Sequence, residues 1–356
     1  MNFSKPLLDW YRSEHRDLPW RKTKDPYVIW LSEIILQQTQ VKQGLPYFEK
    51  FISRFPNVHD LAAASEDEVL KLWQGLGYYS RARNLHYTAQ YVSKTLNGHF
   101  PDNFKDLKQL KGVGDYTAAA IASFAYDEPV AVVDGNVQRV LSRYLGIQTP
   151  INSTEGIKEF KYKAQQMLDA SDPAIYNQAI MEFGAMHCRP KSPKCMFCMF
   201  QKDCAAFQQG LQEELPVKLK KTKVKKRYFD YLVMLDQDGY TLVRKRSGAG
   251  IWKGLYEFPL LEHEQAQKQP SQELVCDLLK TQKLAINEIL PYNEVPVVHL
   301  LSHRKIMASF FKVVVKGKLS EVQLADNFEV IALNDLHQLA VPVLIQNFIE
   351  TEFSTA

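Results

Sequence analysis

Residues 107–139 read LKQLKGVGDYTAAAIASFAYDEPVAVVDGNVQR, which combines a glycine turn, a run of small side chains and one isolated acidic residue. Gly112 and Gly114 flank Val113, so the backbone here can adopt positive φ and approach another surface. The alanine run that follows consists of strong helix formers. A glycine turn leading into a helix N-terminus offers unpaired N–H groups that suit a phosphate. The same pattern also fits an ordinary tight turn between two helices.

The isolated acidic residue is Asp134, which stands between an apolar run and a predicted helix that ends near Gly146. Aspartate is a strong helix N-cap, so Asp134 has a structural explanation. A carboxylate at this place can also point into a cleft, where the helix N-terminus would hold it ionised. The two explanations are compatible, and Asp134 is a candidate catalytic residue.

A second acidic residue, Glu33, is the only charged residue between Tyr27 and Val41, within a helix predicted over residues 26–43. The pair Asp25-Pro26 marks the helix start. The helix is apolar nearly all round, which predicts burial. Burial raises the pKa of a carboxyl group, and a glutamate that titrates near neutrality suits general acid catalysis. A structural glutamate paired with an arginine is the alternative.

The chain has 356 residues, enough for two domains, and its 46% hydrophobic and 24% charged composition is that of a soluble globular protein. No apolar run approaches the ~18–20 residues of a membrane span. The first residues lack the apolar segment of a secretory signal. We therefore expect no membrane partner and a cytoplasmic protein. The net charge of +4 fits nucleic-acid binding without requiring it.

Four of the five cysteines have the spacing C-x6-C-x2-C-x5-C, at Cys188, Cys195, Cys198 and Cys204. Without a secretory signal, this crowding predicts metal binding rather than disulfides. Zinc and an iron–sulfur cluster both accept four cysteines, and the presence of only one C-x2-C pair favours the cluster modestly.

Residues 75–84, GLGYYSRARN, combine glycines, tyrosines and arginines. Tyr78 could stack on or wedge between bases and Arg81 could hold a phosphate, although tyrosines packed in a loop explain the pattern equally. After about residue 205 the helical period ends and a basic run follows, from Lys218 to Arg227. Strands predicted at 228–235 and 240–245 flank Asp236–Gly239 as a hairpin, and later strands and helices complete an α+β domain.

These motifs together resemble the helix-hairpin-helix DNA glycosylases of the endonuclease III superfamily. LSEIILQQTQV (31–41), GLGYYSR (75–81) and VDGNV (133–137) are similar to its MutY family of adenine DNA glycosylases. GLYEFP (254–259) and residues 301–303 resemble that family's Nudix-like domain. No Glu-rich Nudix box follows, so we expect no pyrophosphatase activity. The resemblance implies an all-α helix-hairpin-helix domain with an Fe–S cluster loop (1–205), a basic linker (206–227) and an α+β Nudix-like domain (228–356).

The resemblance also implies a reaction, the hydrolytic removal of adenine mispaired with 8-oxoguanine or guanine after the base is flipped from the duplex. Glu33 would protonate adenine N7, and Asp134 would stabilise or trap the oxocarbenium-like sugar. Asn136 would orient Asp134. Tyr116 stands where lyase-competent relatives have lysine, which implies a monofunctional enzyme.

Double-stranded DNA with an A:8-oxoG or A:G mispair is the implied partner of a monomeric enzyme. A [4Fe-4S] cluster on the four cysteines would order the basic residues Arg189, Lys191 and Lys194. Leu301 replaces the family's usual Phe and loses aromatic stacking. The implied DNA contacts are Gln38, Tyr78, Arg81, Gly112, Val113, Gly114, Leu301, Ser302 and His303.

Three other functions fit parts of the sequence. A bifunctional pyrimidine glycosylase/lyase is disfavoured by Tyr116 and by the long C-terminal domain. A DNA-binding module without activity is disfavoured by two carboxylates, which repel an anion. An Fe–S electron carrier rarely needs a scaffold of this size and type.

Overall fold

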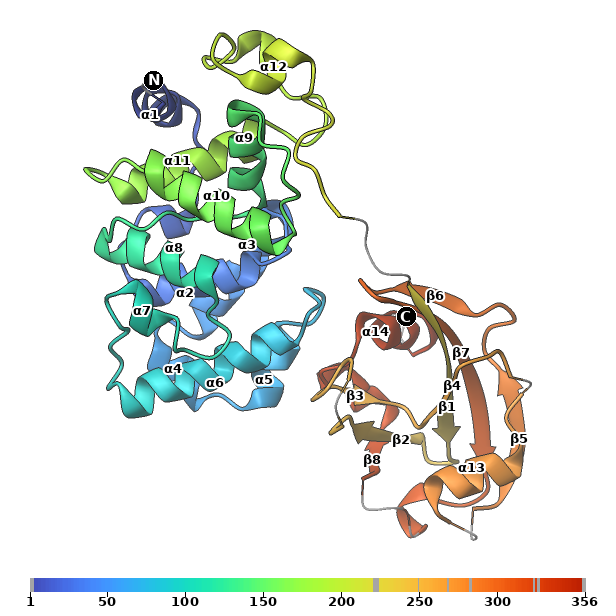
Figure 1. Cartoon of the computed structure of the whole chain (residues 1–356). Helices are drawn as coiled ribbons and strands as arrows, with labels where there is room; N and C mark the ends of the chain where they lie inside the picture. The colour runs from blue at the N-terminus through green and yellow to red at the C-terminus, as the bar shows by residue number, and fades with distance from the viewer. Residues whose placement is uncertain are drawn as a thin grey trace. The chain divides into compact units, whose positions relative to one another are not determined.

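The computed structural model describes residues 3–219, 224–248, 250–267, 269–281, 284–322, 324 and 327–353, which group into two compact units (Figure 1). The first unit comprises Met1–Ala63 and Asn84–Lys220, and the second comprises Ala64–Arg83 and Lys221–Ala356. The chain thus passes from one unit to the other inside a helix, after Arg83. Our boundaries at residues 205 and 227 remain a prediction. Part of the basic run, Lys220, Lys221 and Lys223, lies outside the described residues.

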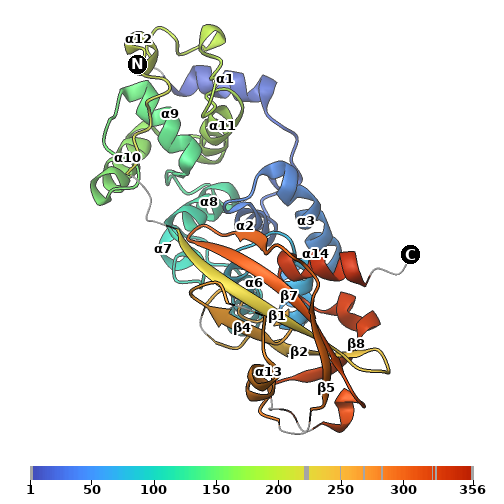
Figure 2. The same cartoon turned by 90° about the vertical axis from the view of Figure 1, so that its right-hand side faces the viewer.

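Helices build the first unit, and Figure 2 shows α1 beside α11. One part of its core gathers side chains from α1, α9, α10 and α11, including Leu7, Val140, Phe160 and Phe183. No helix in the described ranges is long and apolar enough to cross a bilayer. The helices up to residue 209 are α1 (Ser4–Glu14), η1 (Pro19–Arg21), α2 (Pro26–Leu36), α3 (Val41–Arg54), α4 (Val58–Ala63), α5 (Glu66–Leu72), α6 (Ser80–Thr95), α7 (Phe104–Leu107), α8 (Asp115–Tyr126), α9 (Gly135–Leu145), α10 (Thr154–Met167), α11 (Pro173–Met186), η2 (Cys195–Phe197) and α12 (Ala205–Gln209).

The single helix predicted over residues 26–43 is wrong, because the structure divides it into α2 and α3. The backbone of Gln38 is left-handed, with φ of 56°, and the Thr39 N–H donates to Leu36 O instead of continuing the helix. Residues 37–40, at the break, are polar but include no glycine or proline to signal the end of a helix. The break places Gln38 at the wall of a cavity that Glu33 and Asp134 also line.

The second unit contains two sheets, with strand order β4-β1-β7-β5 in one, where β6 also pairs with β7, and β3-β2-β8 in the other. Strands β1 and β7 are parallel and pair along their length, from Lys225 with Arg304 to Leu235 with Val314 (Figure 2). Parallel strands need a long connection, which here runs over residues 236–303 and contains β2 to β6 and α13. The elements are β1 (Lys225–Leu235), β2 (Tyr240–Lys245), β3 (Tyr256–Glu257), β4 (Leu260–His263), α13 (Gln272–Leu279), β5 (Ile286–Pro291), β6 (Val297–Leu300), β7 (Arg304–Val315), η3 (Leu319–Glu321), β8 (Glu329–Ala332), η4 (Leu333–Gln338) and α14 (Val343–Glu352).

The predicted hairpin of β1 and β2 is also wrong. The turn forms, since the Asp236 N–H donates to Tyr240 O, but the two strands enter different sheets. Strand β1 pairs with β7 and β4 and is buried from Phe229 to Met234, whereas β2 pairs with β8 and β3. Turn residues predict a reversal of the chain but not the ladder partner of each strand.

Candidate active site

Helix α2 buries Glu33 among apolar side chains, leaving it 5% exposed. Asp25 caps the helix and accepts a hydrogen bond from the Tyr27 N–H. The Tyr116 hydroxyl donates to Glu33 Oε2 over 2.6 Å. Burial raises the pKa of Glu33 to about 7, against the lowering effect of the Tyr116 hydrogen bond and Arg21. The side chain can therefore give and take a proton near neutral pH.

Asp134 caps α9 and is held by three hydrogen bonds. Its Oδ1 accepts from the Asn136 and Val137 N–H groups at 2.9 and 2.7 Å, and its Oδ2 accepts from Asn136 Nδ2 at 2.6 Å. Asp134 is thus the N-cap of α9, and Asn136 contacts the same carboxylate. The orienting role of Asn136 stays a prediction. Burial raises the pKa of Asp134 above its usual value, and the hydrogen bonds from Val137 and Asn136 oppose this rise. The lowering influence expected of the helix N-terminus is present, but burial outweighs it.

Arg139 and Gly184 support Asn136 from behind, and our reading of the sequence missed both. Arg139 Nη2 donates to Asn136 Oδ1 at 2.9 Å and to Gly184 O at 2.6 Å. A Cβ at Gly184 would lie 2.7 Å from Asn136 Cβ, so only glycine fits there. Arg139 Nε also donates to Cys188 O at 2.8 Å, which joins α9 to the cysteine loop. This buried arginine therefore holds the neighbour of a candidate catalytic carboxylate.

A second glutamate, Glu182, was also missed. It is the only charged residue of α11 and is 1% exposed. It accepts hydrogen bonds from Arg16 Nε at 2.7 Å and Nη2 at 2.6 Å, and from Arg21 Nη2 at 2.7 Å. Burial would raise its pKa, but the hydrogen bonds from Arg16 and Arg21 outweigh burial and lower the pKa to about 2. Glu182 is therefore an anion locked between two cations.

One cavity of about 730 Å³ joins these groups. Its volume falls within the range of small-molecule sites. It is lined by Glu33, Tyr116, Asp134, Asn136 and Glu182, together with Arg16, Arg21, Arg139 and Gln38. The structure thus brings together all four predicted catalytic residues and one of the predicted DNA contacts. A cavity with two carboxylates of raised pKa and fixed cationic walls is suited to acid-assisted cleavage of a bond to a leaving group that the acid can protonate.

The glycine turn has the form expected of a helix-hairpin-helix motif between α7 and α8. Gly112 has φ of 81°, whereas Gly114 has φ of −91° and caps α8, so only the first needs a glycine's freedom. A Cβ at Gly112 would lie 2.8 Å from Asn84 Cβ, and one at Gly114 would meet nothing. The side chain of Val113 is buried and its N–H donates to Leu110 O at 3.1 Å, so both are used within the turn. The open approach at Gly114 and the helix N-terminus behind it suit a phosphate.

Known proteins share both units. Residues 31–166 match the HhH-GPD superfamily base excision DNA repair protein family, and residues 230–351 match the NUDIX domain family. The chain is 37% identical over 303 residues to the adenine DNA glycosylase of Buchnera aphidicola subsp. Acyrthosiphon pisum (strain APS), covering 85% of this chain and 83% of the relative. It is 32% identical to the Homo sapiens adenine DNA glycosylase, covering 95% and 72%. The chain belongs to the adenine DNA glycosylase family.

Solved structures agree with the helical fold of this glycosylase. A thermostable thymine-DNA glycosylase superposes with a TM-score of 0.54 at 31% identity, covering 58% of this chain and 95% of that one. A non-covalent Endonuclease III–DNA complex superposes with a TM-score of 0.51 at 20% identity, covering 58% and 94%, and shows the fold alone. The expected fold class, a helix-hairpin-helix domain followed by a Nudix-like domain, is confirmed.

Two predicted DNA contacts of the glycosylase, Gln38 and Tyr78, have left-handed backbones although neither is glycine. Such residues cost of order 1–3 kcal/mol each and concentrate at functional sites. The Tyr78 ring is 46% exposed. Arg81 differs from the exposed phosphate contact that we expected. It is buried, and its Nη2 donates to Leu76 O and Gly77 O at 3.2 and 3.3 Å, so it supports the turn that presents Tyr78.

Leu301, Ser302 and His303 form the connection between β6 and β7. The Leu301 N–H donates to Arg304 O at 2.8 Å, which closes the turn and leaves Ser302 and His303 exposed. The Ser302 hydroxyl hydrogen-bonds with the Tyr78 hydroxyl inside the second unit. Two predicted DNA contacts that are 224 residues apart in the chain therefore meet.

The four clustered cysteines line one small cavity between α11 and α12. Arg143 lies at its edge, with Nη1 donating to Cys188 Sγ at 3.5 Å and to Arg189 O at 2.7 Å. Burial raises the pKa of the Cys198 thiol to about 12. In the described part of the chain, no three His, Cys, Asp or Glu side chains are arranged to share one metal ion. A single zinc requires four sulfurs at about 2.3 Å from one point, whereas the irons of a cluster each take their own cysteine. Four cysteines are a donor set that either kind of cofactor accepts.

Proposed function

We propose that this glycosylase removes adenine opposite 8-oxoguanine, and adenine in A:G mispairs, from double-stranded DNA by hydrolysis of the N-glycosidic bond. Its relatives are named adenine DNA glycosylases. The observation that carries the proposal is the presence of Glu33, with a pKa of about 7, in one cavity with the helix-capping Asp134. A purine is a poor leaving group until its ring is protonated, so a group that shares a proton near pH 7 fits this reaction.

Glu33 protonates N7 of the flipped adenine. The bond between C1′ and N9 then breaks, its electron pair leaves with the base, and positive charge develops on the sugar. Asp134 stabilises this charge or forms a transient bond to C1′, and water completes the hydrolysis. Asn136 and Arg139 keep the Asp134 carboxylate in place. Tyr116 holds the Glu33 carboxyl group in one orientation.

The enzyme is monofunctional in this proposal, because Tyr116 supplies no amine that could form a Schiff base with the sugar. Lys42 and Lys218 also line the cavity, and both side chains are exposed. Strand cleavage without alkali, together with a borohydride-trapped adduct, would show that one of these amines reaches C1′.

Each of the two units carries some of the remaining predicted DNA contacts. The N–H groups around Gly112 and Gly114 hold a backbone phosphate, and Gln38 and Tyr78 fill the space left by the flipped base. Ser302 can accept from the N7–H of 8-oxoguanine, a donor that guanine lacks, and His303 can pair with its C8 oxygen. One copy of the chain supplies every group needed, so the enzyme acts as a monomer on chromosomal DNA.

Cys188, Cys195, Cys198 and Cys204 would hold a [4Fe-4S] cluster, which when bound would fix the fold of the loop that carries Arg189, Lys191 and Lys194. These cations are placed for contact with DNA phosphates rather than for the chemistry. Iron and acid-labile sulfide in the purified protein would support this assignment, and zinc without iron would refute it.

The proposed reaction is tested with duplexes that contain A:8-oxoG, A:G or thymine glycol. We expect adenine release from the first two, strand breakage only after alkali, and no action on thymine glycol. Asp134→Asn should bind the A:8-oxoG duplex yet release no adenine, because the amide keeps the shape and loses the charge. Release from thymine glycol alone would contradict the proposal, as would wild-type rates for the Asn variant.

A further inference from the structure

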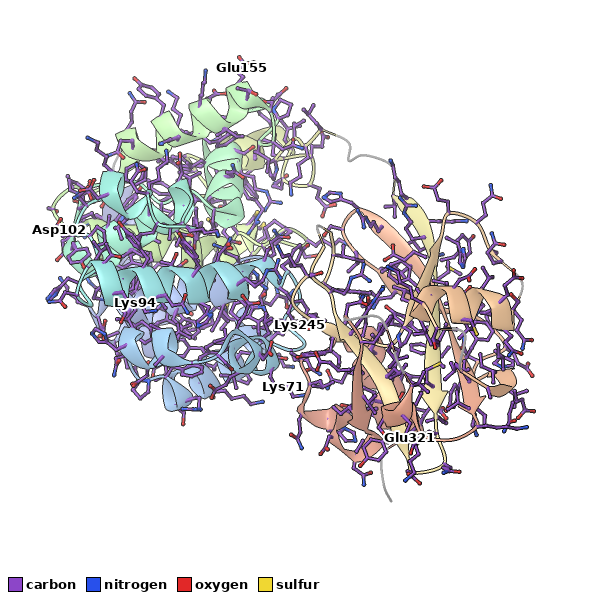
Figure 3. All side chains as sticks on the ribbon, turned by 90° about the horizontal axis from the view of Figure 1, so that it is seen from below. Lys71, Lys94, Asp102, Glu155, Lys245 and Glu321 are labelled. Carbon is purple, nitrogen blue, oxygen red and sulfur yellow. The ribbon has the colours of Figure 1, made fainter. Side chains whose placement is uncertain are left out.

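Residues 64–83, which comprise α5, the glycine turn and the first residues of α6, group with the sheets of the second unit rather than with the other helices. Several polar contacts attach this segment along its length. They are the ion pair of Asp67 with Lys245 Nζ, the bond from Lys71 Nζ to Leu339 O at 3.0 Å, the bond from Arg83 Nη1 to Lys253 O at 2.5 Å, and the Tyr78–Ser302 hydrogen bond. Figure 3 labels Lys71 and Lys245.

The end of β2 and the loop that follows it supply two of these contacts, through Lys245 and Lys253. Gly254 explains how the loop comes so near. Its φ is 82°, and a Cβ there would lie 3.1 Å from Leu70 Cδ1 and 3.2 Å from Glu66 Oε1. A side chain at this position would crowd α5, so the glycine allows the loop backbone to lie directly against the segment.

The same segment carries Tyr78, whose ring is exposed and whose hydroxyl reaches Ser302. The turn that holds this ring has positive φ at Gly75, Gly77 and Tyr78. A strained turn keeps its shape only when its surroundings determine it. The position of the Tyr78 ring relative to Ser302 therefore depends on how residues 64–83 are attached to the sheets.

We propose that the Asp67–Lys245 ion pair and the Arg83–Lys253 hydrogen bond determine mispair specificity, by holding the Tyr78 wedge beside the Leu301–His303 turn. Asp67, Lys245 and Arg83 are positioning residues, since they act through Tyr78. The inference rests on the proposed reading of 8-oxoguanine by that turn. When residues 64–83 are attached to the sheets, a base that bonds to Ser302 also fixes the position of the Tyr78 ring. With the attachment broken, adenine release opposite 8-oxoguanine slows more than release from A:G, which offers Ser302 no N7–H.

The test uses full-length protein and single-turnover rates on A:8-oxoG and A:G duplexes. Lys245→Asp and Asp67→Lys each place like charges together, and each should lower the ratio of the two rates by roughly two- to fivefold, the range for an exposed ion pair. The double variant restores the opposite charges and should recover the ratio. Arg83→Met should lower the ratio and Arg83→Lys should keep most of it, because lysine retains a donor. Both rates are measured on the same preparation, so their ratio does not depend on the fraction of active protein.

Lys94→Asp is the matched control, since Lys94 is an exposed residue of α6 outside the segment and the change of charge is the same (Figure 3). It should leave the ratio unchanged. An unchanged ratio in the single Asp67, Lys245 and Arg83→Met variants would overturn the inference, and so would failure of the double variant to recover. Joint replacement of Ser302 and His303 by alanine separates the two levels. If that variant also keeps the ratio, the proposed reading of the lesion fails. If it alone lowers the ratio, only the positioning role fails.

Discussion

Helices α2 and α11 of the glycosylase each direct a single charged residue, a glutamate, into the same cavity. On α2, Glu33 accepts a hydrogen bond from Tyr116, and burial raises its pKa to about 7. On α11, Glu182 is as deeply buried, but Arg16 and Arg21 lower its pKa to about 2. The same residue type on the same kind of helix thus has a pKa near neutrality in one case and is a fixed anion in the other.

The difference teaches that burial marks a group as costly but does not decide its role. The partners decide, because two guanidinium groups compensate the buried charge and one neutral hydroxyl does not. In this cavity the compensated glutamate holds the wall together, and the uncompensated one is left to exchange a proton with the ligand.

Of the two glutamates, Glu33 should show the larger effect on activity when it is replaced. Glu33→Gln keeps the size and removes the transferable proton, so adenine release should fall by about 10²–10⁴-fold, the usual value of general acid catalysis. Single-turnover assays measure the rate, and affinity for the mispair should change little. Glu155→Gln makes the same change on the exposed face of α10 and should have no effect (Figure 3). A Glu33→Gln rate within a few-fold of wild type would remove Glu33 from the chemistry.

At Glu182 the corresponding change should act on stability first. Glu182→Gln leaves Arg16 and Arg21 without a counter-charge, and breaking a buried pair in this way costs about 3–5 kcal/mol. Chemical denaturation of the two variants and of Glu155→Gln measures the loss. A Glu182→Gln protein as stable as wild type would mean that solvent compensates the two arginines.

The two glutamates should change the stability of the protein in opposite directions as the pH changes. Glu182 binds fewer protons when folded, so its contribution of about 3 kcal/mol is present above pH 4.5 and is lost as the pH falls towards 2. Glu33 binds more protons when folded, so it lowers stability by a similar amount as the pH rises from 4.5 through 7. Each glutamine variant should abolish one of these slopes and leave the other.

The smallest effect is expected at Tyr116, the neutral hydrogen-bond partner of Glu33. Tyr116→Phe removes a hydrogen bond that lowers the pKa of Glu33, so this pKa should rise further. Because the protonated acid is the active form, the rate falls above its pKa, and this alkaline limb should move to higher pH. Single-turnover rates from about pH 5 to about pH 9 record the limb. A limb that stays in place would assign the titration to another group.

The sequence predicted much of this site because its signals are local. Glu33 stood out as a lone charge in an apolar helix, and Asp134 as a helix cap after an apolar run. The same lone-charge signal marks Glu182 in residues 173–186 and could have found it. The Nudix-like tail was identified from short motifs rather than from any long-range pattern.

What escaped prediction depends on contacts between distant residues. No local signal distinguishes Glu33 from Glu182, because the arginines lie more than 160 positions away from Glu182 in the chain. The left-handed turn at Gln38 has no glycine or proline to announce it. The parallel pairing of β1 with β7 joins strands that are separated in the chain by residues 236–303.

Arg139 is a single guanidinium with two duties, since it binds Asn136 beside Asp134 and the carbonyl of Cys188 at the start of the cysteine loop. Disorder of that loop would therefore remove one contact of Arg139, which supports the proposed catalytic carboxylate of Asp134 through Asn136. A preparation with damaged loops would behave as a mixture of competent and idle enzyme rather than as a uniformly slower one. Active-site titration, rather than turnover, would measure the competent fraction of such a preparation.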